Sequence, residues 1–154
     1  VWVGGYGKEY EEAFLLFLEA AKEMNDYNVL VSFHPKMGGA FEREQIKNNN
    51  VHLLTEISTM EAVARADIVI CHQSTVGVQA AFAGKPVLYL IPPSQTYTNP
   101  VIEKNFAPRL QSAQALIWAL KDPKPAPQDF FEAMQIPRHS AELIFNELFF
   151  FEEP

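Results

Sequence analysis

One stretch of the chain decides the fold, and it reads ADIVICHQSTVGVQAAFAGKPVLYL from Ala66 to Leu90. Its start, Ile68 to Cys71, is a short apolar run rich in β-branched residues, which favours a strand. A polar turn, a helix of small residues and, after Gly84, a second apolar run come next. Two strands joined by a helical crossover run parallel, because a hairpin needs only a short turn. We therefore predict a βαβ unit.

Polar residues come directly after the first strand of this unit: His72, Gln73, Ser74 and Thr75. Ligands of open parallel sheets bind outside the carboxyl ends of the strands, where these residues lie. We expect Ser74 or Thr75 to be the helix N-cap, so that N–H groups of the first turn point outward and attract an anion by about 0.3–1 kcal/mol. The alternative is that Ser74 only caps the helix, as many serines do.

Apolar runs and helical patterns alternate on both sides of this unit. We predict the strands of the sheet at 1–3, 28–33, 51–54, 68–71, 86–91 and 106–110. Besides the helix of the unit, we predict helices at 8–24, 40–47, 60–65, 101–104 and 113–121. This alternation indicates an α/β protein with a Rossmann-like, three-layer α/β/α domain of about six parallel strands over residues 1–122.

The turn after the first strand is Gly4-Gly5-Tyr6-Gly7. Glycines between a strand and a helix let the backbone approach a ligand closely. The loop lacks the Gly-Lys-Ser/Thr ending of a Walker loop, and it is not GxGxxG. Plain turn chemistry is therefore the alternative to ligand binding at Gly5, Tyr6 and Gly7.

The second predicted strand runs into His34-Pro35-Lys36-Met37-Gly38-Gly39. Pro35 disfavours a helical conformation of His34, so the chain stays extended up to the imidazole. His34, the ammonium of Lys36 and the backbone amides of the turn offer a small anion several donors. A purely structural histidine is the alternative.

Composition limits the classes of function. A chain of 154 residues is long enough for one domain with a real core, and its formal net charge of −7 argues against broad electrostatic binding of nucleic acid. It has no run of the roughly eighteen apolar residues that a membrane-spanning helix needs. Its one cysteine, Cys71, excludes an internal disulfide, and we expect it to be buried and inert. We expect a cytoplasmic location, with attachment to the inner face of the membrane left open.

The two ends of the sequence predict a missing preceding domain and a carboxy-terminal helical segment. The chain starts without Met and enters a strand at once, so we expect an excised piece whose preceding domain is missing. We interpret residues 123–154 as a proline-rich spacer with helices at 128–135 and 137–151 after it, which pack on the domain or on the missing one. Four phenylalanines of the last helix exceed what one helix face buries, and we expect them to contact the missing half or a second copy: Phe145, Phe149, Phe150 and Phe151.

The order of motifs resembles a known family. The motifs are Val31-Ser32-Phe33-His34-Pro35, then Ala66 to Ile70 with Ser74-Thr75-Val76 behind it, then Ala83 to Leu88, with an ending at 136–144. Together they resemble the carboxy-terminal, nucleotide-sugar-binding half of GT-B fold glycosyltransferases. Similar patterns occur in UDP-N-acetylglucosamine 2-epimerases, CDP-glycerol glycerophosphotransferases and bacterial capsule sialyl- and Kdo-transferases. The resemblance covers nearly the whole chain.

This resemblance implies roles for single residues. It implies that His34, Ser74 and Thr75 hold donor phosphates, that the glycine loop approaches the donor, and that the loop around Glu56 and Ile57 contacts the base. Gln79 stands where many relatives have a Glu or Asp that grips a hydroxyl group, so its neutral amide discriminates differently. The candidate donor-binding residues are Gly5, Tyr6, Gly7, His34, Lys36, Ile57, His72, Ser74, Thr75 and Gln79.

The leading hypothesis is a glycosyltransferase of surface polysaccharide or glycan synthesis, with a nucleotide-sugar donor as substrate and no cofactor. No carboxylate pair with metal spacing is visible, so we expect no metal, and we expect the catalytic base in the missing amino-terminal half. The piece alone is expected to be inactive. A nucleotide-sugar 2-epimerase, against which Gln79 counts, and a non-catalytic nucleotide- or phosphate-binding module stay open as alternatives.

Overall fold

Six short strands form one sheet in the computed structural model, which describes residues 1–5, 7–47, 50–127 and 129–135. The strand order is β3-β2-β1-β4-β5-β6, and every neighbouring pair is parallel. This confirms the predicted α/β class with a parallel sheet. The strands are β1 (Trp2–Val3), β2 (Val29–Ser32), β3 (Val51–Leu53), β4 (Val69–Cys71), β5 (Val87–Leu90) and β6 (Arg109–Leu110).

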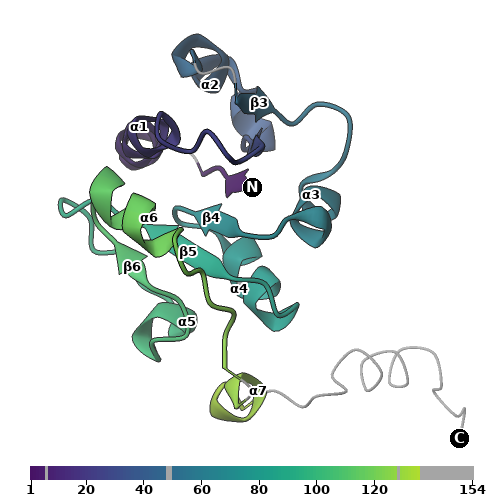
Figure 1. Cartoon of the computed structure of the whole chain (residues 1–154), viewed down its shortest axis with the longest axis vertical. Helices are drawn as coiled ribbons and strands as arrows, with labels where there is room; N and C mark the ends of the chain where they lie inside the picture. The colour runs from purple at the N-terminus through teal and green to yellow at the C-terminus, as the bar shows by residue number, and fades with distance from the viewer. Residues whose placement is uncertain (6, 48–49, 128, 136–154) are drawn as a thin grey trace, which may run out of the picture.

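Helices connect the strands and lie on both sides of the sheet (Figure 1). They are α1 (Lys8–Ala21), α2 (Ala40–Gln45), α3 (Thr59–Arg65), α4 (Thr75–Phe82), α5 (Pro100–Glu103), α6 (Ala113–Ala119) and α7 (Phe130–Ala133), with a 3-10 turn at Pro35–Met37. No helix in the described ranges is both long and apolar enough to cross a membrane. Because helices pack on both sides of the sheet, the predicted three-layer α/β/α arrangement is present.

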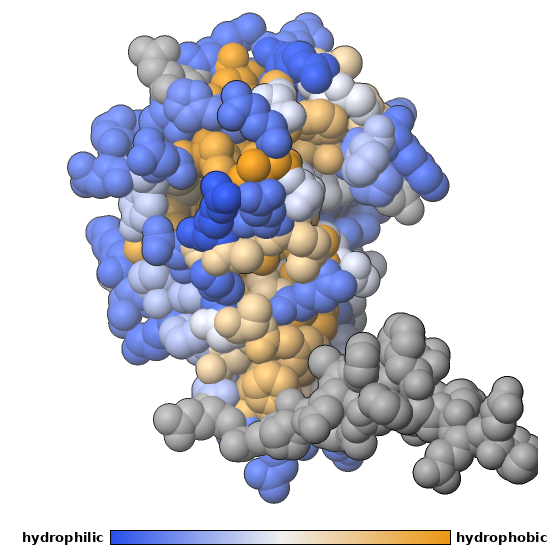
Figure 2. All heavy atoms as spheres, turned by 90° about the vertical axis from the view of Figure 1, so that its right-hand side faces the viewer, coloured by the Kyte–Doolittle hydropathy of each residue, from blue (hydrophilic) through white to orange (hydrophobic). Residues whose placement is uncertain are grey.

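Side chains alternate along the strands and so fill two cores. Trp2 enters the core beneath α1 and α6, where its ring stacks on Phe17 with centroids 4.5 Å apart. The next residue, Val3, enters the core beneath α3, α4 and α5 together with Tyr89. Polar residues cover most of the face seen in Figure 2, and apolar residues reach the surface in a band down its middle.

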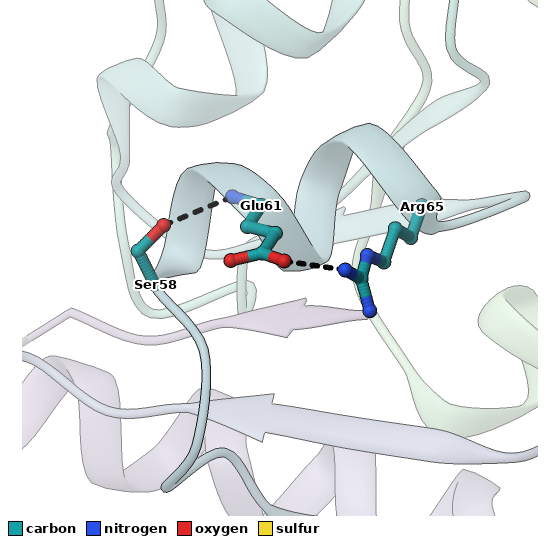
Figure 3. A network of polar contacts seen from close by, with 3 residues as sticks. All are labelled: Ser58, Glu61 and Arg65. Carbon is teal, nitrogen blue, oxygen red and sulfur yellow. Dashed lines mark hydrogen bonds and ion pairs between the residues drawn. The ribbon is translucent and has the colours of Figure 1, made fainter.

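Serine side chains cap several helices, and Ser74 is one of them, as predicted. Ser74 accepts a hydrogen bond from the Val76 N–H, and Ser112 accepts one from the Ala115 N–H. At the start of α3, Ser58 accepts from the Glu61 N–H, and the Glu61 carboxylate pairs with Arg65 one turn later (Figure 3). These bonds satisfy N–H groups that the first helical turn leaves without a backbone partner.

The carboxy-terminal segment is described only as far as residue 135. Pro125 forms an isolated bridge with Pro86, and the buried ring of Phe130 lies 4.8 Å from that of Phe82, centroid to centroid. The described part of 123–135 thus lies against the sheet domain, and the predicted boundary at residue 122 stays a prediction. The helix predicted at 137–151 and its four phenylalanines lie outside the described residues.

The centre of the sheet contains a topological switch point. The chain leaves β1 for β2 on one side and leaves β4 for β5 on the other, so the connections after these neighbouring strands diverge. Val3 pairs with Ser32 and with Cys71, which brings the next residues, Gly4 and His72, to one edge of the sheet. A crevice at this position is where open α/β sheets bind ligands.

Candidate functional site

The glycine loop begins against the backbone of β2. The Gly4 N–H donates to the Ser32 carbonyl at 2.7 Å, and a Cβ on Gly4 would lie 2.6 Å from the same oxygen. Glycine is therefore required for this close approach. A Cβ on Gly5 would lie 3.5 Å from His72 Nδ1, so Gly5 faces that imidazole. Gly7 has φ +86° and is the N-cap residue of α1; Tyr6 lies outside the described residues.

The turn after β2 uses His34 locally. His34 stays extended before Pro35, as predicted, and its Nδ1 accepts the Lys36 backbone N–H at 3.3 Å. One amide that the sequence analysis offers to a ligand is thus bonded to the imidazole. The Lys36 side chain is exposed, and Gly38 and Gly39 both have positive φ, which closes the turn.

Helix α4 begins directly beside the crevice. Ser74 is its N-cap, and Thr75 is exposed at its first position. Tyr89 donates its hydroxyl to the Ser74 carbonyl at 3.4 Å, which ties the start of α4 to β5. Burial raises the pKa of the Cys71 thiol to about 12, in line with the predicted inert cysteine.

His72 is almost fully buried. Only 1% of it is exposed, and its Nε2 lies 2.6 Å from Gln95 Oε1. Its Nδ1 is buried and has no hydrogen-bond partner among the described residues. Burial lowers the pKa of the imidazole, while the bond to Gln95 and the carboxylates of Glu9 and Glu12 oppose this effect.

A crevice of about 480 Å³ opens between the glycine loop and α4. This volume lies in the range of small-molecule sites. Both Lys8 and Glu9 contribute charge, and Gln73 donates to the Glu9 carboxylate at 2.9 Å. The crevice is lined by Gly7, Lys8, Glu9, His72, Gln73, Thr75 and Tyr97.

The structure brings some of the predicted residues together and separates others. Gly7, His72 and Thr75 line the crevice, and Gly5 and Ser74 adjoin it through His72 and Thr75. Four other described residues from the predicted set are not in its lining: His34, Lys36, Ile57 and Gln79. His34 and Lys36 come after the neighbouring strand β2, and Gln79 is exposed further along α4. Ile57 lines a second cavity of about 410 Å³, together with Val1 and Ile68 at the starts of strands.

Three buried polar residues near the glycine loop are not among the predicted site residues: Tyr10, Glu42 and Gln95. Tyr10 donates its hydroxyl to Glu42 Oε1 at 2.7 Å, and Glu42 is only 1% exposed. Gln95 joins His72 to α1, and its carbonyl accepts from Arg109 at 2.6 Å. Nothing in the periodicity distinguishes Glu42 from exposed glutamates of a short helix, and Gln95 lies in a polar loop without a pattern.

Two comparisons with known proteins found nothing: no family model and no curated protein matches the chain. Solved structures do match. UDP-GlcNAc 2-epimerase from Neisseria meningitidis, bound to UDP-GlcNAc, matches with a TM-score of 0.60 at 17% identity, over 96% of this chain and 43% of that one. The chain has the fold of one half of a GT-B enzyme.

The chain also matches the glycotransferase of kitacinnamycin with a TM-score of 0.54 at 14% identity, over 96% of this chain and 42% of that one. The chain thus spans less than half the length of either structure. Identities this low show the fold alone. Among the described residues of the chain, no group of three or more His, Cys, Asp or Glu side chains is arranged to hold a metal ion.

Proposed function

We propose that this chain is the donor-binding half of a glycosyltransferase that acts in surface polysaccharide or glycan synthesis. The observation that supports this most is the crevice of about 480 Å³ at the switch point between β1 and β4, next to a glycine loop and a helix N-terminus. A nucleotide sugar is the substrate of this site. The acceptor and the catalytic base come from a further domain.

The diphosphate of the donor lies at the start of α4. The exposed hydroxyl of Thr75 is a donor there, and the helix dipole favours negative charge. His34 and Lys36 add an imidazole and an ammonium from the next strand along the edge. Because charge develops on the departing nucleoside diphosphate, these groups act electrostatically rather than covalently.

Two assignments from the resemblance stay predictions within this proposal. Gln79 contacts a hydroxyl group of the sugar, for which its exposed position on α4 leaves it available. Ile57 contacts the base, although its described neighbours belong to the second cavity.

A nucleotide-sugar 2-epimerase is the second candidate. Its support is the fold likeness to UDP-GlcNAc 2-epimerase. An epimerase moves a proton at carbon and needs acidic and basic side chains for that step, and the amide of Gln79 supplies neither. The identity of the product separates the two enzymes, and turnover of any kind separates both from a non-catalytic binding module.

The first test is calorimetric titration of the chain with UDP, CDP, GDP, dTDP and CMP. We expect one nucleotide to bind, and we expect Ser74→Ala to weaken it roughly tenfold, which corresponds to about 1.4 kcal/mol. Loss of the cap leaves an unpaired N–H and shifts the first turn of α4.

Ser112→Ala is the matched control. Ser112 caps α6 through the same kind of bond, at 3.1 Å to the Ala115 N–H, and it is not in the crevice lining. Both variants should lose about 1 kcal/mol of stability, and only Ser74→Ala should lose affinity. Equal losses of affinity would show that Ser74 acts through stability alone, and silence from all five nucleotides would contradict the proposed function.

A further inference from the structure

Gln95 is buried within a loop that is otherwise largely polar. It is 4% exposed, whereas its neighbours Ser94 and Thr96 are exposed. Its side chain connects the end of β4, through His72, to the first turns of α1, through Glu9. Its backbone carbonyl accepts from Arg109 on β6. A glutamine held from three elements has a fixed orientation.

The hydrogen bonds also determine which way the amide of Gln95 faces. Its Nε2 lies 2.8 Å from the backbone carbonyl of Glu9, and a carbonyl oxygen can only accept. The amide nitrogen therefore points to α1, and Oε1 points to His72 at 2.6 Å. Because Oε1 can only accept, His72 must donate from Nε2.

A neutral imidazole that carries its proton on Nε2 has a lone pair on Nδ1. In His72 this atom is buried, faces Gly5 and has no donor among the residues that the structure describes. Buried acceptors are nearly always paired, so an empty one at the edge of a ligand crevice indicates a group that arrives with the ligand. An acceptor takes an O–H or N–H group and repels a phosphate oxygen.

We propose that Gln95 is a positioning residue that holds His72 in the Nε2–H tautomer, so that Nδ1 accepts a hydrogen bond from a hydroxyl group of the donor instead of contacting its phosphates. This inference rests on the proposed function and divides the site into two parts. The start of α4 takes the phosphates, and the His72 side of the crevice takes a hydroxyl-bearing ring.

The charges around His72 favour the same division. Glu9 and Glu12 of α1 both act on the imidazole, and Gln95 and Ser94 bond to the Glu12 carboxylate. A phosphate placed here would meet these carboxylates, whereas a hydroxyl would not be repelled. Gly5 carries no side chain, so only its backbone lies against Nδ1.

The ring nitrogens of His72 provide a direct test in the wild-type protein. In a 15N-labelled sample near neutral pH we expect one protonated nitrogen, Nε2, and one unprotonated nitrogen, Nδ1. Addition of UDP-N-acetylglucosamine should move the Nδ1 resonance, and inorganic pyrophosphate, which has no hydroxyl group, should not. A proton on Nδ1 in the free protein, or a shift with pyrophosphate, would overturn the proposal.

Gln95→Glu tests the role of the positioning residue. A carboxylate beside Nε2 favours the imidazolium form, in which Nδ1 becomes a donor, and it cannot donate to the Glu9 carbonyl. We expect affinity for UDP-N-acetylglucosamine to fall about tenfold and affinity for pyrophosphate to stay within about twofold. Titration of Gln95→Glu with UDP then identifies which hydroxyl group His72 contacts. A tenfold loss of affinity for UDP as well indicates a hydroxyl of the ribose, and an unchanged affinity for UDP indicates a hydroxyl of the sugar. A tenfold gain for pyrophosphate would assign His72 to phosphate instead.

Ser94→Ala is the control from the same loop. Ser94 bonds to Glu12 at 2.7 Å and is exposed. We expect Ser94→Ala to leave the 15N spectrum of the His72 ring and all affinities unchanged. If Ser94→Ala lost as much affinity as Gln95→Glu, the role of Gln95 would only be to hold the loop in place. Gln95→Leu removes the acceptor without adding charge and should give mixed tautomers. If the wild-type protein binds no nucleotide, the proposed function and the hydroxyl contact fail together, while the ring spectrum still decides the tautomer.

Discussion

Gly77 sets how closely α4 approaches the sheet. A Cβ there would lie 2.8 Å from Tyr89 Cζ and 2.9 Å from Cys71 Sγ, and both side chains are fully buried. Gly77→Ala gains some helix propensity but forces a buried ring to move. We expect a net loss of about 1–2 kcal/mol, measured as the urea midpoint of unfolding.

Tyr89→Phe provides the check on this prediction. In the Gly77→Ala background it removes the hydroxyl that the new methyl group meets and should recover part of the loss. Alone it should cost about 0.5–1.5 kcal/mol, because it removes the bond to the Ser74 carbonyl. Wild-type stability of Gly77→Ala would contradict the close approach.

At the scale of residues, sequence predicts which side chains come directly after a strand and little else. Gly7, His72 and Thr75 meet in the crevice because strand and helix alternation alone places them at the carboxyl edge. Gln95 contacts His72 across 23 positions, and no local pattern reports such a contact. The surroundings of Ile57 are equally hidden from the local sequence. Its loop is predicted, but the cavity that Ile57 lines depends on the packing of other strands.

Helix α2 has only six residues and depends on tertiary contacts. The buried bond from Tyr10 on α1 to Glu42 on α2 is one of them, and Trp2 donates to the same hydroxyl at 3.4 Å. Tyr10→Phe leaves a buried carboxylate unpaired, so we expect it to cost about 1–3 kcal/mol in urea unfolding. Together with Glu42→Leu the loss should be smaller than the sum of the single losses by about 1 kcal/mol.

Tyr27→Phe is the matched tyrosine control for this cycle. Its hydroxyl donates to the Leu120 carbonyl at 3.0 Å, and the side chain is 39% exposed. We expect a smaller loss of about 0.5–1.5 kcal/mol that adds to that of Glu42→Leu. Additive losses in the Tyr10 cycle would show that the bond does not couple α1 and α2.

At the scale of elements, the six strands and the helices predicted up to residue 135 are present in the predicted order, and they differ from the structure at their ends. The helix predicted at 8–24 ends at Ala21, although Met24 is buried as its spacing suggests. The strand predicted at 106–110 is reduced to Arg109–Leu110, because the sheet edge pairs only these residues with β5. Periodicity reports burial, and burial continues past the last hydrogen bond of an element.

For the whole molecule, His72 links stability to pH. Burial lowers the pKa of its imidazole below the ordinary 6.5. Between the two pKa values the unfolded chain therefore binds a proton at His72 and the folded chain does not. The free energy of unfolding should therefore receive its full His72 contribution above about pH 6.5 and lose it as pH falls toward the folded pKa. Urea unfolding at several pH values measures this slope.

A His72→Gln variant isolates the contribution of this group. It cannot titrate, so the difference between its profile and that of the wild type should change only below about pH 6.5. Gln73→Ala alters the neighbouring residue without removing a titratable group and should keep the wild-type slope. A His72→Gln profile parallel to the wild type throughout would contradict the buried neutral imidazole.

The central position of β1 has a consequence for synthesis. Among the described elements β1 is the first to leave the ribosome, yet it pairs with β2, at 29–32, and with β4, at 69–71. The indole of Trp2 in β1 cannot be fully packed until β4, which ends at Cys71, has emerged. The β4–α4–β5 unit is local in sequence and can assemble as a block, whereas the middle of the sheet closes only when β4 pairs with β1, which was synthesised well before it.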